Sequence, residues 1–252
     1  MHPSRLNIDA ILFDLDGTLL QVEMQEFIPR YLQLLSSWFV PEIEPGRFQT
    51  TVRAAIFDLL QPRDGALTNE ELFLQALERQ LGIAPERFRQ VYGRWLEAEV
   101  ETLQPLVTSH PLAELLLEEA FAHGARVVIA TNPVFPRRLI EARLRWAGLD
   151  RYPYSLVTCY ENSRHCKPNP EYFQEVLEKL DLLPEQCLMI GNDNHHDLAA
   201  FRAGISTYLV ETWLIDRGVA RLEPQYRGDH AALLAFLQKL PLRRPAVTEG
   251  VG

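Results

Sequence analysis

Short apolar runs alternate with polar turns and amphipathic stretches at the start of the chain and through its second half. The apolar runs are rich in Val, Ile and Leu, and they occupy residues 10–13, 126–130, 156–159, 187–190 and 207–210. Near-continuous apolar runs of this length are typical of strands that are buried on both faces of a parallel sheet. The pattern therefore predicts five strands at these positions.

Helical patterns separate the predicted strands. They cover residues 111–123, 135–147, 170–180 and 195–203. Pro111 and Pro170 suit the first turn of a helix, and Gly124, Gly148 and Gly204 suit the position just after its last turn. Strands that alternate with helices in this way predict an α/β fold with a doubly wound parallel sheet.

The stretch from residue 21 to residue 106 breaks the alternation. It has no convincing strand, and its helical patterns cover residues 23–38, 48–60, 69–81 and 85–103. Thr68 and Glu71 form a capping-box pattern that opens the third of these helices. We expect residues 21–106 to form a helical domain inserted into an α/β core of residues 1–20 and 107–240, with a flexible tail over 241–252.

Composition and charge narrow the possible functions. The net charge is −9 and no long run of Lys or Arg occurs, which argues against nucleic acid or an anionic membrane as the main partner. The apolar stretch of residues 8–15 is interrupted by Asp9 and Asp14, and it is too short for a secretion signal or a membrane span. Three irregularly spaced cysteines fit a reducing compartment. We expect a cytoplasmic protein, either a monomer or a homodimer.

Polar residues gather at the predicted carboxyl ends of the strands, where open α/β sheets bind their ligands. The eight candidates are Asp14 and Asp16 after the first strand, Thr131 and Asn132 after the second, Lys167 after the third, and Asn192, Asp193 and Asp197 after the fourth. Neighbouring carboxylates repel unless a hard cation lies between them, and oxygen ligands of this kind suit Mg²⁺. A metal and a lysine neutralise a phosphoryl group in transfer, and a carboxylate can attack its phosphorus.

These residues resemble the four motifs of the haloacid dehalogenase-like (HAD) superfamily. Residues 14–18, Asp-Leu-Asp-Gly-Thr, are similar to its first motif, and Thr131-Asn132 to its second. Lys167-Pro168 is similar to the third motif, and residues 191–193, Gly-Asn-Asp, with Asp197 to the fourth. The resemblance extends over residues 8–210. It implies a Rossmann-like core in which residues 21–106 form the superfamily's small helical (C1) cap.

The resemblance also implies roles for the eight candidates. Asp14 would be the nucleophile and a metal ligand, and Asp16 would be the general acid and base, with its backbone carbonyl on the metal. Thr131, Asn132 and Lys167 would bind the phosphate of a small phosphorylated metabolite. The fourth motif would complete a Mg²⁺ site. Either Asn192 or Asp193 could be its ligand next to Asp197, because the commonest form of this motif has Asp directly after Gly.

Three other functions compete with that of a phosphatase. A haloacid dehalogenase needs no acid at the position of Asp16, because a halide leaves without a proton. A phosphomutase needs an additional acid or lysine from the cap, and no lysine occurs in residues 21–106. A non-catalytic regulator on the same fold is disfavoured because Asp14, Asp16, Thr131 and Lys167 are all present. A phosphatase is therefore the leading hypothesis.

Two further expectations concern residues outside the motifs. His195 and His196 lie beside the acidic fourth motif, and we expect them to face solvent from the first turn of a helix. Aromatic residues of the insertion recur at helical spacing, and we expect them in its core. They are Phe27, Tyr31, Trp38, Phe57, Phe73, Tyr92 and Trp95.

Overall fold

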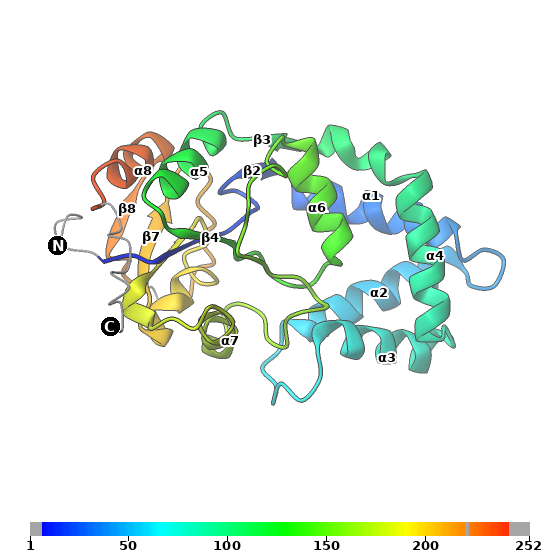
Figure 1. The fold of residues 1–252 in the computed structure, drawn as a ribbon. Helices are drawn as coiled ribbons and strands as arrows, with labels where there is room; N and C mark the ends of the chain where they lie inside the picture. The colour runs from blue at the N-terminus through cyan, green and yellow to red at the C-terminus, as the bar shows by residue number, and fades with distance from the viewer. Residues whose placement is uncertain (1–6, 220–221, 242–252) are drawn as a thin grey trace, which may run out of the picture.

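Six parallel strands form the main sheet in a computed structural model, which describes residues 7–219 and 222–241 (Figure 1). From one edge to the other, the strands are β5 (Leu156–Val157), β4 (Arg126–Ile129), β1 (Ala10–Phe13), β6 (Cys187–Gly191), β7 (Ser206–Val210) and β8 (Tyr226–Gly228). The five predicted strands are all present, although β5 ends two residues early. Strand β8 was not predicted. All but one residue of the expected tail lie outside the described part of the chain.

Helices cover both faces of this sheet, as the doubly wound fold requires. Ile11 and Phe13 of β1 point into one core, which also contains side chains of α5 (Ala113–Ala122), α6 (Arg137–Trp146) and α8 (His230–Leu237). Ala10 and Leu12 point into the other core, formed with α7 (Pro170–Leu180) and η4 (Leu198–Ala203). Because successive side chains of a strand point to opposite faces, every residue of β1 is buried.

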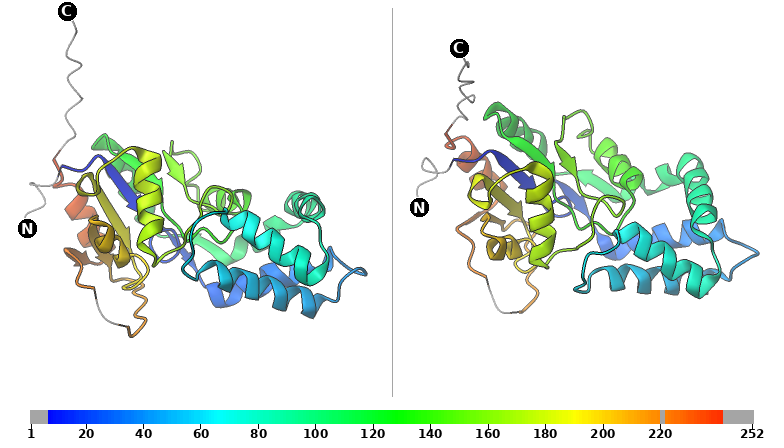
Figure 2. Two further views of the ribbon diagram at one scale, coloured as in Figure 1. Left: turned by 90° about the horizontal axis from the view of Figure 1, so that it is seen from below. Right: turned by 60° about the horizontal axis from the view of Figure 1, so that its bottom comes forward.

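The helical insertion lies between two short strands. Strand β2 (Leu20–Val22) pairs antiparallel with β3 (Val107–Ser109), so the chain leaves the sheet and returns to it at adjacent points. Between them are α1 (Met24–Ser37), α2 (Pro45–Leu59), α3 (Asn69–Leu81), α4 (Pro85–Ala98) and η2 (Val100–Leu106). Figure 2 shows α1, α2 and α3, in blue to cyan, standing beside the sheet. That residues 21–106 form a domain of their own stays a prediction.

Local signals in the sequence fix several helix ends. The capping box of α3 is confirmed: Thr68 Oγ1 accepts a hydrogen bond from the Glu71 amide at 3.2 Å, and Glu71 Oε2 accepts one from the Thr68 amide at 2.7 Å. The prediction of one long helix over residues 85–103 is wrong. Helix α4 ends at Ala98 because Glu99, with a φ of −131°, leaves the helical conformation, and the tighter η2 follows. Pro111 lies in the turn before α5 rather than in its first turn.

Aromatic side chains fill the interior of the insertion. Phe39 stacks on Phe48 and on Phe88, with ring centroids 4.7 and 5.9 Å apart. Phe57 does not belong to this core, contrary to expectation: it is 63% exposed because it lies on the outer side of α2. A buried amide joins the insertion to the rest of the chain, since Asn69 Nδ2 donates to the Pro133 carbonyl oxygen at 3.0 Å.

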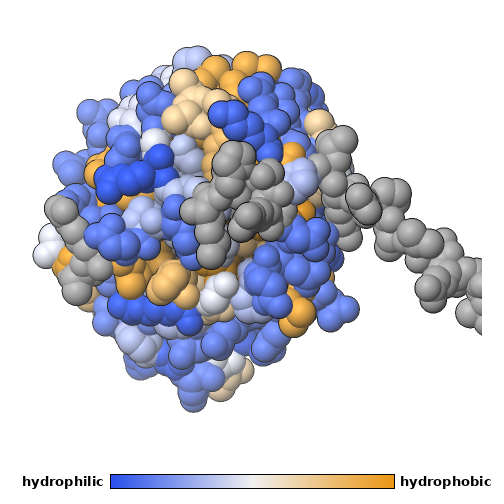
Figure 3. All heavy atoms as spheres, turned by 90° about the vertical axis from the view of Figure 1, so that its left-hand side faces the viewer, coloured by the Kyte–Doolittle hydropathy of each residue, from blue (hydrophilic) through white to orange (hydrophobic). Residues whose placement is uncertain are grey.

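The face of the molecule on the side of α8 and β8 is mostly polar. Figure 3 shows hydrophilic residues over most of this face, with hydrophobic ones in separate groups between them. Isolated apolar side chains are normal on a protein surface. In residues 7–219 and 222–241, no helix is long and apolar enough to cross a membrane.

Two stacked histidines join the start of the chain to its last helix. The rings of His110 and His230 lie 3.5 Å apart between centroids, with an interplanar angle of 13°. His230 also contacts the Thr18 carbonyl oxygen through Nε2 at 2.8 Å and Thr212 Oγ1 through Nδ1 at 2.7 Å. Burial, and then the charge of His230, lower the pKa of His110 to about 4, and burial also lowers the pKa of His230.

These lowered pKa values predict acid destabilisation. Below the ordinary histidine pKa of about 6.5, the unfolded chain binds protons that the folded chain does not, so the free energy of unfolding falls as pH decreases towards 4. The variant His110→Phe keeps the stacked ring but removes one titrating group. We expect it to lose less stability than the wild type between pH 7.5 and pH 5 in urea denaturation. An equal loss in both proteins would contradict this account.

Candidate active site

The order of the strands places three motif segments side by side. Strand β1 lies between β4 and β6, so Asp14 follows the central strand of the three, with Thr131 after β4 on one side and Asn192 after β6 on the other. The Asp14 amide donates to the Ile190 carbonyl oxygen at 2.8 Å, which fixes the start of the first motif against β6. The carboxyl ends of these strands therefore form the floor of one site.

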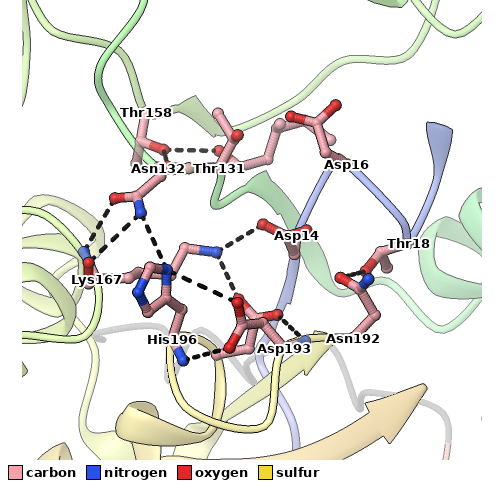
Figure 4. Close-up of polar contacts among 12 residues, drawn as sticks. Asp14, Asp16, Thr18, Thr131, Asn132, Thr158, Lys167, Asn192, Asp193 and His196 are labelled. Carbon is pink, nitrogen blue, oxygen red and sulfur yellow. Dashed lines mark hydrogen bonds and ion pairs between the residues drawn. The ribbon is translucent and has the colours of Figure 1, made fainter. Parts of the chain in front are cut away.

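A buried lysine connects the first, third and fourth motifs. Lys167 Nζ donates to Asp14 Oδ1 at 2.7 Å and to Asp197 Oδ1 at 2.6 Å (Figure 4). Burial alone would lower the pKa of Lys167, but the charges of Asp14 and Asp197 raise it above its ordinary value. Burial, followed by the charge of Asp14, raises the pKa of Asp197 to about 7. The lysine therefore stays charged and holds two acids that would otherwise repel each other.

The second motif supports the loop that carries this lysine. Asn132 Oδ1 accepts a hydrogen bond from the Lys167 amide at 3.1 Å, and Asn132 Nδ2 donates to the Lys167 carbonyl oxygen at 3.4 Å. Thr158 Oγ1 donates to the Thr131 carbonyl oxygen at 2.7 Å, so the backbone of Thr131 is fixed while its hydroxyl is left to the site. Asn132 thus contacts the lysine loop as well as the cavity.

Glycine is required where the fourth motif approaches its neighbours. A Cβ on Gly191 would lie 2.2 Å from Asp197 Oδ2, and one on Gly17 would lie 2.1 Å from Asn192 Nδ2. Gly17 also has a φ of +83°, a conformation that other residues rarely adopt. At both positions the backbone therefore lies directly against a side chain of the site. Any residue larger than glycine would displace that side chain.

Asp193 is surrounded by donors from the protein. Its Oδ1 accepts hydrogen bonds from the amides of His195 at 3.0 Å and His196 at 2.9 Å. Its Oδ2 accepts a hydrogen bond from Arg217 Nε at 2.6 Å and forms an ion pair with Arg217 Nη2 at the same distance. Although burial raises the pKa of Asp193, the hydrogen bond from Arg217 leads the interactions that lower it below its ordinary value.

His196 contradicts the expectation that it faces solvent from a helix. It lies in the turn before η4, is half-buried, and lines the same cavity as the motif residues. Its Nδ1 lies 3.5 Å from Asn132 Nδ2. Burial lowers the pKa of His196 to about 4, against the charge of Asp193, so the ring is neutral at pH 7. His195 is also half-buried in that turn.

Asp16 has a basic partner that the sequence did not suggest. Its Oδ1 forms an ion pair with Nη2 of Arg143, a fully buried residue of α6. The guanidinium carbon of Arg143 lies 5.3 Å from the ring centroid of Phe27 and 6.0 Å from that of Phe135. Burial lowers the pKa of Arg143 to about 10. Figure 4 shows the Asp16 carboxylate pointing away from the contact between Lys167 and Asp14.

One cavity of about 300 Å³ collects the motif residues. All eight candidates from the sequence line it: Asp14, Asp16, Thr131, Asn132, Lys167, Asn192, Asp193 and Asp197. His196 and Arg217 line it too, and no sequence signal pointed to Arg217. In the described part of the chain, no three His, Cys, Asp or Glu side chains are arranged to hold a metal ion. The expected ligand set differs from such a cluster, since it includes an amide and a backbone carbonyl.

Comparison with known proteins places this site in a family. A sequence model of the haloacid dehalogenase-like hydrolases matches residues 8–204. Pyrophosphatase PpaX of Bacillus mycoides (strain KBAB4) is 27% identical over 226 residues, which are 89% of this chain and 92% of the relative.

Solved structures share the fold at lower identity. A HAD phosphatase from Thermococcus onnurineus has a TM-score of 0.58 and 17% identity, and the match covers 93% of this chain and 100% of that one. An L-2-haloacid dehalogenase has a TM-score of 0.57 and 16% identity, with coverage of 92% and 99%. Because a phosphatase and a dehalogenase share this fold, the likeness leaves the reaction to be inferred from the site.

The pair of Asp16 and Arg143 predicts unequal effects of removing its partners. Asp16→Ala leaves a buried guanidinium unpaired among aromatic rings, which we expect to cost about 3–5 kcal/mol of unfolding free energy. Arg143→Met leaves Asp16, whose side chain is 23% exposed and can hydrate, so we expect a change within about 1 kcal/mol.

Urea denaturation of the two single variants and of the double variant measures this coupling. The double variant should recover most of the stability lost in Asp16→Ala, because the unpaired guanidinium is gone. Equal losses of unfolding free energy in the two single variants would contradict the prediction, because Asp16 would then depend on Arg143 as strongly as Arg143 depends on Asp16.

Proposed function

The chain belongs to the haloacid dehalogenase-like hydrolases, and from that premise we propose that it hydrolyses phosphate monoesters of small metabolites through an aspartyl-phosphate on Asp14, with Mg²⁺ as cofactor. The observation that carries the proposal is the contact of Lys167 with both Asp14 and Asp197 on the floor of a cavity that Asp16 also lines. A nucleophilic carboxylate, a buried cation and a second acid are the groups that phosphoryl transfer by this route needs.

In the first step, a carboxylate oxygen of Asp14 attacks the phosphorus, and the bond from phosphorus to the alcohol oxygen breaks. Lys167 compensates for the negative charge of the phosphoryl oxygens, and the Thr131 hydroxyl donates to one of them. Asp16 gives its proton to the leaving alcohol. Because Asp16 is paired with Arg143 as a carboxylate, this step requires that the pair opens and that Asp16 takes up a proton.

In the second step, water attacks the phosphorus of the aspartyl-phosphate. Asp16, now a carboxylate, removes a proton from that water, and inorganic phosphate leaves as Asp14 is regenerated. Asp16 therefore ends the cycle protonated, as the first step of the next turnover requires, and Asp14 is again a free carboxylate.

The oxygen donors of the cavity suit a hard cation. We propose that the Asp14 carboxylate, the Asp16 backbone carbonyl and the Asn192 amide oxygen hold Mg²⁺, with Asp197 nearby. Asn192 is preferred to Asp193 because both Asp193 oxygens already have partners in the protein: Oδ1 accepts two hydrogen bonds from backbone amides, and Oδ2 is held by the Arg217 guanidinium. When bound, the ion supplies positive charge that stabilises the phosphoryl oxygens in the transition state.

The competing functions find less support in the cavity. A phosphomutase needs an acid or base from the insertion, but the insertion's described side chains that line the cavity are all apolar. A dehalogenase has no use for a proton donor at Asp16. A regulator without activity would not need the paired charges around Lys167. We propose that residues 21–106 act as a cap over the site, and that the protein works in the cytoplasm as a monomer or homodimer.

A generic aryl phosphate tests the mechanism. We expect hydrolysis that requires Mg²⁺ and is lost on chelation. Asp14→Asn should lower kcat by at least about 10³-fold, because the amide is a poor nucleophile. Asp150→Asn, at an exposed position after α6, is the matched control and should retain wild-type activity. Robust turnover by Asp14→Asn or in excess chelator would overturn the proposed mechanism.

A further inference from the structure

The cavity above Asp14 has two chemically different parts. Its floor consists of the charged and polar residues of the sheet described above. Another part of its lining comes from the insertion, through four apolar side chains that are each half-buried: Met24, Ile28, Ile56 and Leu60. Val134 and Phe135, from the loop after β4, extend this surface. We call these six residues the apolar wall.

The apolar wall follows from helical spacing. Met24 and Ile28 are four residues apart at the start of α1, and Ile56 and Leu60 are four apart at the end of α2. Residues at this spacing lie on one face of a helix, so each helix presents a continuous apolar stripe to the cavity. The next residue along α2 after Ile56 points elsewhere: Phe57 does not line the cavity and is 63% exposed.

The cavity offers no uncommitted cation for a second anionic group. Among its described lining residues the basic side chains are Lys167, Arg217 and His196. The Nδ1 of His196 lies 3.5 Å from Asn132 Nδ2 and 3.4 Å from Arg217 Nη2, so it faces two donors and is placed as an acceptor. Lys167 donates hydrogen bonds to Asp14 and Asp197, and Arg217 donates one to Asp193. A second phosphate, or a ring of hydroxyl groups, would therefore face the apolar wall without partners, which is unfavourable for polar groups removed from water.

We infer that the substrate is a phosphate monoester of an apolar alcohol, aromatic or branched aliphatic, that carries no second phosphate. This inference rests on the proposed phosphatase function. The phosphate would occupy the polar floor beside Asp14 and Thr131, and the hydrocarbon part would lie against the apolar wall. Burial of that part removes apolar surface from water on both sides of the contact, which favours binding.

Esters of primary alcohols separate this preference from differences in leaving-group chemistry. We compare 2-phenylethyl phosphate with glucose 6-phosphate, which is also an ester of a primary alcohol, at saturating Mg²⁺. Inorganic pyrophosphate, an anhydride with a better leaving group, is compared under the same conditions because it carries a second phosphate. The expected kcat/KM for 2-phenylethyl phosphate is at least about tenfold higher than for either of the others. Equal or better turnover of glucose 6-phosphate or pyrophosphate would overturn the inference. If no phosphate compound were hydrolysed, an aryl phosphate included, the proposed function itself would fail.

A charge placed on the apolar wall provides a second test. Ile56→Lys adds a cation beside the floor, and we expect the ratio of kcat/KM for 2-phenylethyl phosphate to that for pyrophosphate to fall at least about tenfold. Phe57→Lys adds the same charge one position further along α2, outside the cavity, and should leave the ratio unchanged.

Circular dichroism establishes whether each variant is folded, and Met24→Lys repeats the test from α1. If folded Ile56→Lys and Met24→Lys both kept the wild-type ratio, the apolar wall would not contact the substrate. The wild-type comparison decides the question independently if neither variant folds.

Discussion

A lysine held between two aspartates is the interaction on which the rest of the site depends. Lys167 donates to Asp14 and Asp197, and solvent is nearly excluded from all three. A protein tolerates such buried charges only where opposite charges and hydrogen bonds compensate for the lost hydration. Asp14 and Asp197 meet because β1 and β6 are neighbours in a parallel sheet, and Asn132, after β4, holds the backbone of Lys167. The ion pairs therefore need the completed sheet, and Gly191 is needed to leave room for Asp197.

The sequence allowed much of this arrangement to be predicted, because the sheet is built from buried strands with strong patterns. Four of the five apolar runs stopped near charged or turn residues. The rule that parallel strands share one functional edge then predicted that Asp14, Thr131 and Asn192 lie together. Strands β2, β3 and β8 escaped prediction for a physical reason. Each has three residues and is only partly buried, so it offers too few positions for a period to be recognised.

The basic partners of Asp16 and Asp193 could not be predicted, because tertiary packing selects them. Arg143 lies among the buried apolar residues of α6, where its charge was the only local signal, and its partner Asp16 is more than a hundred residues away. Arg217 reaches Asp193 from the segment after β7, which has no motif. His196 was expected in solvent because a helix was predicted to begin at His195. The helical segment begins only at Leu198, and His196 lies in the preceding turn, where its side chain lines the cavity.

Two carboxylates two residues apart thus acquire different surroundings. Asp14 faces Lys167 on the floor of the sheet, whereas Asp16 faces Arg143, whose guanidinium lies against the aromatic rings of Phe27 and Phe135. Phe27 belongs to the insertion, so the partner of Asp16 packs against the insertion, while the partners of Asp14 belong to the sheet. The sheet therefore determines the proposed nucleophile and its charge, and the helices determine both the surroundings of the proposed acid and the apolar wall. A change in α1 or α2 can alter which alcohol fits without disturbing Lys167, since none of its hydrogen bonds to side chains involves the insertion.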